Sequence, residues 1–289
     1  MHVDVEKLKI ETKDLIQLND VYNNLCNNYY SELNKIREYW HDAHANYFFK
    51  LGENEKIDCI VFNDEYKNIR DLYDYIIKKY SNIGNKVEFN LDNKDTYISD
   101  VNKYVKYIDT IINNYRDIDF SFDLKIRKYI DDEVSKYVSM RDKIFDILDD
   151  NKTVLTDVED VERQVASILS KLSIMKIKPS NRKNLSFGFE GSKSMDISSI
   201  EVCLKKMVYY VKEEEINYES ISDLFDNINY NYDTSNRDDI DSIFVDFLRK
   251  YKIIIENHKN NIALLNTNIN NYREGLRRAI KALEGDING

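Results

Sequence analysis

The side chains best suited to chemistry are four histidines and three cysteines, which are scattered along the chain. Glu38 and His41 match the Glu-x-x-His element of di-iron helical bundles, but such a site needs that element on two helices and the sequence holds no second copy. His41, Asp42 and His44 could ligate one metal ion, yet they lie where a helix is expected to end, and polar residues are common there. We therefore predict no metal site and no cofactor.

Three further features could support catalysis, and each is better explained as structure. His258 lies on the apolar stripe of a long helix, so we expect a hydrogen-bonded core or interface histidine. The segment from Gly188 to Lys193 resembles a phosphate loop but lacks its four-residue gap and preceding buried strand. No cysteine has a histidine nearby in sequence, which leaves only a pairing in space open. Because no nucleophile, base and oxyanion donor can be named, we predict that the protein is not an enzyme.

The cysteines and the first residues bear on the cellular compartment. Cys26, Cys59 and Cys203 are odd in number and far apart, so we expect small buried core residues and no disulfide framework. The stretch from Met1 to Glu6 is polar and acidic, without the basic and apolar regions of a Sec signal peptide. We therefore expect a cytoplasmic protein, unless a type VII system secretes it.

The composition favours long helices. Hydrophobic residues make up 42% of the 289 residues and charged residues 33%, a mixture typical of a folded chain with a well-solvated surface. One proline and seven glycines are too few for the many tight turns of a β-sandwich or barrel. The net charge is −10, with basic residues interleaved among acids, which argues against a nucleic-acid partner. No apolar run approaches the ~18–20 residues needed to cross a bilayer, so we predict no membrane span.

Three similar units follow one another along the chain. Each begins with two apolar residues two positions apart, which we expect to form a short extended lead-in. The three pairs are Val3 and Val5, Val87 and Phe89, and Phe187 and Phe189. Two ladders of apolar residues, spaced three and four apart, follow each pair in the pattern of an amphipathic helix. The sequence therefore predicts an all-α fold of three tandem helical hairpins that form elongated helical bundles.

Polar joins set the boundaries between these units. The predicted units are a first hairpin at 1–84, a second at 85–176, a linker at 177–194 and a third hairpin at 195–289. Inside the hairpins, the turns are expected at residues 52–55, 116–123 and 232–237. The 177–194 segment holds the only proline, so it is the clearest linker.

The last helix has the longest apolar ladder, from Ile240 to Leu283. At ~1.5 Å per residue it would reach roughly 65 Å, and a rod of that length needs a partner along its stripe. Because the linker separates the third unit, we expect units one and two to pair and the third to recruit a second copy or another helical protein. The predicted interaction residues of this stripe are Phe244, Phe247, Tyr251, Ile254, Ile262, Leu265, Ile269 and Tyr272.

The end of the first ladder resembles a known family. The stretch from Glu32 to Ala43 contains Trp40, the only tryptophan, and resembles the end of the first helix in the WXG superfamily of type VII secretion. Members of that family are helical hairpins, often with an apolar-x-apolar lead-in such as Val3-Asp4-Val5, and two hairpins pair side by side as a four-helix bundle. Their turn reads Trp-x-Gly, and Asp42 stands here in place of the glycine.

This resemblance implies a non-catalytic protein–protein interaction component of a type VII secretion pathway. The chain would be a partner, adaptor or chaperone of secreted effectors, and could itself be exported. The resemblance also implies Trp40, His41 and Asp42 as interaction residues, and as partners a secretion substrate, a small WXG protein or a second copy in a homodimer. The alternative is a coiled-coil or spectrin-like structural scaffold unrelated to secretion.

Overall fold

The computed structural model describes residues 1–41, 43–88, 93–118, 123–172, 177, 179 and 194–287. The helices within these residues are α1 (Val5–Tyr39), α2 (Ala43–Tyr80), α3 (Lys94–Arg116), α4 (Leu124–Leu169), α5 (Ile197–Asn231) and α6 (Arg237–Ile287). The short strands are β1 (His2–Asp4), β2 (Trp40–His41), β3 (Lys86–Glu88), β4 (Ser194–Met195) and β5 (Tyr232–Asp233). The all-α prediction is confirmed. Most of the expected 177–194 linker lies outside the described residues.

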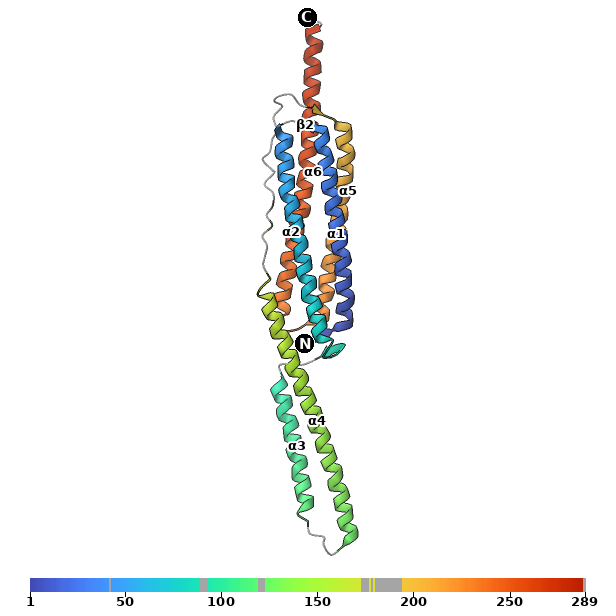
Figure 1. Ribbon diagram of the computed structural model, residues 1–289, viewed down its shortest axis with the longest axis vertical. Coiled ribbons are helices and arrows are strands. Elements are labelled where there is room, and N and C mark those ends of the chain that lie inside the picture. The colour runs from blue at the N-terminus through green and yellow to red at the C-terminus, as the bar shows by residue number, and fades with distance from the viewer. Residues whose placement is uncertain are drawn as a thin grey trace.

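Four of the helices form an elongated bundle. The α1–α2 hairpin and the α5–α6 hairpin pack side by side along their length (Figure 1). The closest packing between the two hairpins joins α1 to α5. The expected pairing of hairpins one and two is therefore wrong. Hairpins one and three pair because α1 and α5 are both 35 residues long, so their apolar stripes cover each other from end to end.

A constant offset of 192 residues relates the two paired hairpins. α1 and α5 follow Asp4 and Asp196, and in each case the carboxylate caps the helix by accepting from the backbone N–H three residues later. The same offset separates the aromatic residues after the two helices, Trp40 and Tyr232. The bundle is thus built from two copies of one pattern.

Short strands tie the ends of these hairpins together. β1 pairs antiparallel with β3 and β5, and β2 pairs antiparallel with β4. The lead-in of each paired hairpin therefore bonds to the turn of the other hairpin. Of the predicted lead-in pairs, Val3 and Val87 are extended and lie opposite each other in the β1–β3 ladder. Val5 is instead the first residue of α1, and Phe89 lies outside the described residues. The lead-in predicted at Phe187 and Phe189 lies outside the described residues.

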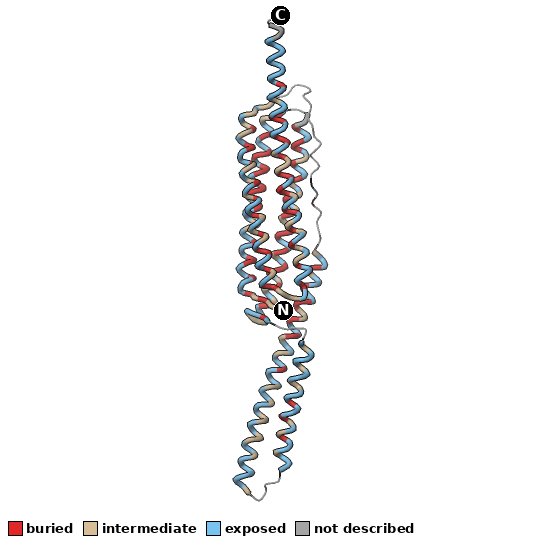
Figure 2. The backbone as a smooth tube through the Cα atoms, turned by 180° about the vertical axis from the view of Figure 1, so that it is seen from behind, coloured by how far each residue is buried: buried red, intermediate tan, exposed pale blue. Residues whose placement is uncertain are grey.

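One hydrophobic core runs the length of the bundle. Figure 2 shows buried residues on every bundle helix over that length. Aromatic rings fill much of it, and full burial of such a side chain contributes ~1.5–3 kcal/mol. The largest buried aromatic side chains include Tyr22, Tyr29, Phe48, Phe62, Tyr66, Tyr73, Phe225, Phe247 and Tyr251. All three cysteines are buried and reduced, as predicted.

The turn predicted at 52–55 is wrong. α2 continues through this segment, and the first hairpin turns after β2 instead. Gly52 has a packing role here, since a Cβ at this position would lie 2.9 Å from Leu33 Cδ2 of α1. The other two predicted turns agree with the ends of the helices that flank them.

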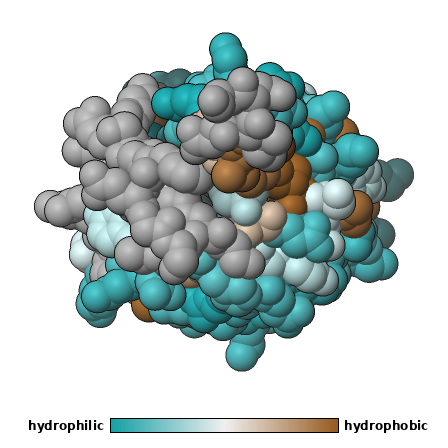
Figure 3. Space-filling model, turned by 90° about the horizontal axis from the view of Figure 1, so that it is seen from above, coloured by the Kyte–Doolittle hydropathy of each residue, from teal (hydrophilic) through white to brown (hydrophobic). Residues whose placement is uncertain are grey.

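The predicted recruiting stripe of α6 is not an open surface. Phe244, Phe247, Tyr251, Ile254, Leu265 and Ile269 are buried in the bundle, and Ile262 and Tyr272 are half-buried. The prediction fails because α6 packs against α5 and α2. α6 exposes Val245 near its start, and its other large exposed apolar side chains, Leu276, Ile280 and Leu283, lie near its end, where the helix extends beyond the bundle (Figure 1). Seen from that end, most of the coloured surface is hydrophilic, and hydrophobic residues gather in a patch near its centre (Figure 3).

The hairpin left outside the bundle is α3–α4. It projects from the end of the bundle where β1 and β3 pair (Figure 1). The last turns of α4 dock on the bundle, where Val158, Val161, Val165 and Leu169 join its core. The rest of this hairpin, residues 94–148, is called the arm below.

Candidate functional sites in the arm and the bundle core

Trp40 is buried at the turn of the first hairpin. Its ring packs against Phe48 and Phe49 of α2, with centroid separations of 5.5 and 6.0 Å. Its backbone pairs with Met195 in the β2–β4 ladder. Only 2% of Trp40 is exposed. The side chain is therefore an anchor inside this chain, and the prediction that it contacts a partner at the surface is wrong.

The other candidate ligands of this turn are described only in part. His41 is exposed, and its Nε2 lies 2.9 Å from the backbone oxygen of Glu38. Asp42 lies outside the described residues, as does the side chain of His44. Within the described part of the chain, no group of three or more His, Cys, Asp or Glu side chains could hold a metal ion.

The arm exposes many large apolar side chains. Tyr104 and Tyr107 of α3 are 68% and 65% exposed, and they are three residues apart, which places them on the same side of the helix. Other exposed large apolar residues of the arm are Tyr97, Ile118, Leu124, Ile126, Tyr129, Met140, Phe145 and Ile147. Figure 2 shows the arm as largely exposed or half-buried, in contrast to the bundle. A lone pair of helices has no further element against which to bury such a surface.

The arm is also nearly neutral. Residues 94–148 hold ten Lys or Arg and eleven Asp or Glu, a net charge of −1 in a chain of net charge −10. Several of these charges pair within the arm, for example Lys136 with Glu133 at 2.6 Å and Arg141 with Asp109 at 3.2 Å. Such a surface selects neither a strongly acidic nor a strongly basic partner.

A single buried carboxylate anchors the base of the arm. Glu162 of α4 accepts hydrogen bonds from Tyr80 Oη at 2.6 Å and from Tyr232 Oη at 2.7 Å. It also accepts from Asn236 Nδ2 at 2.8 Å and from Ser235 Oγ at 3.2 Å. These donors come from α2 and from the turn of hairpin three, so Glu162 fixes α4 to both paired hairpins.

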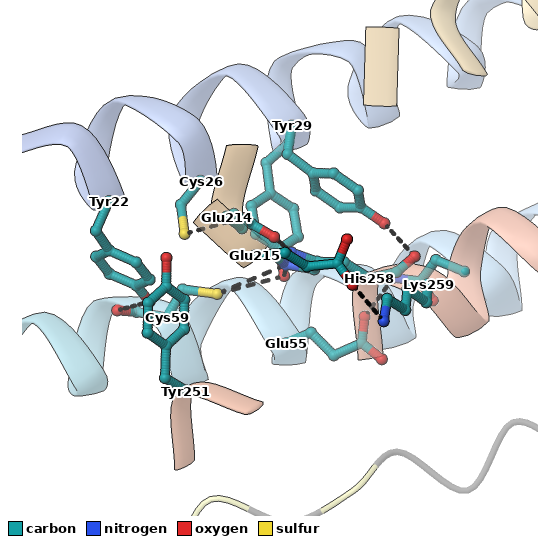
Figure 4. A network of polar contacts seen from close by, with 12 residues as sticks. Tyr22, Cys26, Tyr29, Glu55, Cys59, Glu214, Glu215, Tyr251, His258 and Lys259 are labelled. Atoms are coloured by element: carbon teal, nitrogen blue, oxygen red, sulfur yellow. Dashed lines mark hydrogen bonds and ion pairs between the residues drawn. The ribbon is translucent and has the colours of Figure 1, made fainter. Parts of the chain in front are cut away.

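A polar cluster lies at the centre of the bundle. Cys26, Cys59, Glu214 and His258 come from α1, α2, α5 and α6, so each bundle helix supplies one side chain (Figure 4). His258 Nδ1 lies 2.9 Å from Glu214 Oε2, and His258 Nε2 lies 3.8 Å from Cys59 Sγ. Cys26 Sγ lies 3.8 Å from Glu214 Oε1. The cluster is thus a chain of contacts from one thiol, through the carboxylate and the imidazole, to the other thiol.

Tyrosines surround this cluster. Tyr30 Oη lies 3.0 Å from His258 Nε2 and 3.7 Å from Cys59 Sγ. The Tyr29 ring stacks on the His258 ring at 3.9 Å, and its hydroxyl donates to the backbone oxygen of His258. These contacts confirm the prediction of a hydrogen-bonded core histidine.

The cluster favours a thiolate–imidazolium pair. Burial alone would lower the pKa of His258, but the Glu214 carboxylate and Cys59 raise it to about 10. Burial alone would raise the pKa of Cys59, but hydrogen bonding from Cys26 and the charge of His258 lower it to about 6. A thiolate beside an imidazole held by a carboxylate is the arrangement of a cysteine nucleophile. No sequence motif shows it, because Cys59 and His258 are 199 positions apart.

A pocket of about 110 Å³ lies between α2 and α6. Its lining includes Lys250, which is buried, and which pairs with Glu65 at 2.5 Å and with Asp246 at 2.7 Å. Two carboxylates surround the one ammonium group, so these three side chains together carry a net charge of −1. The Lys250 ammonium is therefore already paired and is not available to bind an anionic ligand.

A buried carboxylate in α1 yields a stability prediction. Burial raises the pKa of Glu11 from 4.5 to about 7, although Asn231 Nδ2 donates to its Oε1 at 2.5 Å. Because the pKa is raised on folding, the stability that the protonated group contributes is complete below pH 4.5 and is lost as the pH rises through 7. We expect Glu11→Gln, which removes the charge, to stabilise the protein by about 1–2 kcal/mol at pH 8 and to change little at pH 4.5. Urea unfolding at the two pH values measures this, and an equal effect at both would contradict the assignment.

None of the described helices combines the length and the apolar composition that a membrane crossing requires. Comparisons of the chain with protein-family models, curated proteins and solved structures found no match.

Proposed function

We propose that this chain is a non-catalytic protein–protein interaction component that assembles through its arm. One observation carries the proposal: the arm projects from a completed four-helix bundle and exposes many large apolar side chains to solvent. Inside the chain, two hairpins bury their stripes against each other. Among the described residues, the α3–α4 hairpin has no such counterpart, and we infer that the hairpin that completes it belongs to another molecule.

The partner that best fits the exposed apolar surface of the arm is the arm of a second copy of the chain. Two arms side by side would form a four-helix bundle, which is the arrangement that hairpins one and three already adopt. Charge favours the same choice. Two whole chains of net charge −10 repel each other, but the arm contributes only −1 of that charge, so two copies meet there with the least repulsion.

Substitution of two arm tyrosines tests this proposal in the full chain. Wild type is expected to scatter light as a dimer of the 34.4 kDa chain, and Tyr104→Glu with Tyr107→Glu as a monomer. Central aromatic residues of an interface are each worth about 2 kcal/mol or more, so the dissociation constant should rise at least ~100-fold. The matched control is Tyr230→Glu on α5, because Tyr230 is 76% exposed and lies outside the arm. It should leave the dimer intact.

Two outcomes would contradict the proposal that a second copy packs on the arm. The first is a wild type that stays monomeric at all concentrations. The second is a wild type that binds a different helical hairpin protein through Tyr104 and Tyr107, which would leave the interaction function in place with another partner.

The pathway that we propose is type VII secretion, with the chain as a partner, adaptor or chaperone of secreted effectors. The support is the WXG-like pattern of hairpin one: an extended lead-in, a 35-residue helix and Trp40 buried at the turn. Hairpin three repeats it with Tyr232 in the place of Trp40, and the two form a four-helix bundle. Binding of the purified chain to a WXG protein or effector from the same genome tests the pathway. Binding only to a cytoskeletal or division protein would favour the structural scaffold instead.

A further inference from the structure

We propose that Cys59 is a site of oxidation by hydrogen peroxide and that Cys26 converts the product to an intramolecular disulfide. The basis is the polar cluster at the centre of the bundle. Two thiols from α1 and α2 point into it: Cys26 Sγ lies 3.8 Å from the Glu214 carboxylate, and Cys59 Sγ lies 3.8 Å from the His258 imidazole that Glu214 holds (Figure 4). This oxidation would consume one hydrogen peroxide per chain, without turnover, and it does not involve the arm. It therefore goes beyond the proposed interaction function.

Cys59 is the thiol that reacts first. Its sulfur lies 3.8 Å from His258 Nε2 and 3.7 Å from Tyr30 Oη, and both groups stabilise a thiolate. Cys26 Sγ instead faces the Glu214 carboxylate at 3.8 Å, and a thiolate there would be repelled. In agreement, the pKa of Cys59 is lowered, whereas burial raises the pKa of Cys26 well above its usual value.

The first step gives a sulfenic acid. The Cys59 thiolate attacks one oxygen of hydrogen peroxide, the S–O bond forms and the O–O bond breaks. The departing hydroxide takes the proton of the His258 imidazolium and leaves as water. Glu214, 2.9 Å from His258 Nδ1, stabilises the imidazolium until that transfer.

The second step gives the disulfide. Cys26 passes its proton to Glu214 Oε1, and its sulfur attacks the sulfur of the Cys59 sulfenic acid. The S–S bond forms, the S–O bond breaks, and the second hydroxide takes the proton from Glu214 through His258. One peroxide and two thiols thus yield one disulfide and two water molecules.

Burial selects the oxidant. Cys26 and Cys59 are 6% and 4% exposed, so only a small, uncharged molecule reaches them through brief local openings of the bundle. Cys203 supplies the control, because its exposed fraction is also small, at 5%, but it lies beside Glu32 with no thiol or histidine partner among its contacts. Bulky thiol reagents should spare the native cluster.

Mass spectrometry of the full chain treated with hydrogen peroxide tests the proposal. We expect a loss of about 2 Da, a peptide that links Cys26 to Cys59, and oxidation at least ~10-fold faster than at Cys203. In Cys26→Ser, the product should instead be a sulfenic or sulfinic acid on Cys59. In Cys59→Ser, Cys26 should be as slow as Cys203.

Circular dichroism confirms that each variant is folded before the reaction. Equal oxidation rates at all three cysteines would overturn the proposal. So would a disulfide that forms only in denaturant, because the folded cluster would then contribute nothing to the reaction.

Discussion

Trp40→Ala is expected to lower the free energy of unfolding by about 3–5 kcal/mol, the usual cost of truncating a buried Trp. The indole ring of Trp40 packs against Phe48 and Phe49. The backbone of Trp40 pairs with Met195 in the β2–β4 ladder, which joins hairpins one and three. The neighbouring rings cannot collapse into the space without disturbing this junction. Urea unfolding followed by circular dichroism at neutral pH measures the change.

Two companion variants interpret the Trp40 result. Trp40→Phe keeps an aromatic ring and should cost less than half as much, since most of the volume stays filled. Tyr230→Ala removes an exposed ring of the bundle and should change the stability by no more than ~0.5 kcal/mol. A Trp40→Ala protein as stable as Tyr230→Ala would show that the ring does not anchor the two hairpins.

Glu162→Ala should cost about 3 kcal/mol or more, because one buried acceptor serves four donors. Without it, the hydroxyls of Tyr80 and Tyr232 lose a charged partner in a buried site. The base of the arm should loosen as well, since Glu162 connects α4 to both paired hairpins. Urea unfolding gives the stability, and amide hydrogen exchange over residues 149–169 gives the loosening.

Glu159 provides the control for this variant. It lies less than one turn before Glu162 on α4, is partly exposed and pairs with Lys94. Glu159→Ala should cost no more than ~1 kcal/mol, as expected of an ion pair near the surface. Equal costs for the two variants would contradict the role of Glu162 as the buried anchor.

The sequence predicts the helices better than their partners. Apolar residues spaced three and four apart identify the helices because the period is local. The pairing of hairpins depends on contacts between residues far apart in the sequence. The proline-containing linker predicts that hairpins one and two pair, which is wrong. A better signal was present: Asp4 and Asp196, and Trp40 and Tyr232, share an offset of 192 residues. Equal helix length and equal capping indicate which two hairpins match.

Two other features show where local signals fail. The glycine and polar residues at 52–55 have the composition of a turn, but α2 is continuous there. Gly52 instead leaves room for the Leu33 side chain of α1. The thiol cluster has no local signal at all, because its four side chains come from four helices. Cys59 meets His258 because hairpins one and three pair. A sequence analysis that predicts a different pairing therefore cannot predict the thiol cluster.

The concentration dependence of amide hydrogen exchange tests most directly whether the arm is the assembly surface. If two arms pair, amides within residues 94–148 should exchange more slowly as the protein concentration rises, and those of the bundle should not change. The Tyr104→Glu and Tyr107→Glu protein should show the fast exchange of the dilute wild type at every concentration. Protection confined to the end of α6, around Leu276 to Leu283, or no change along the whole chain, would contradict assembly through the arm.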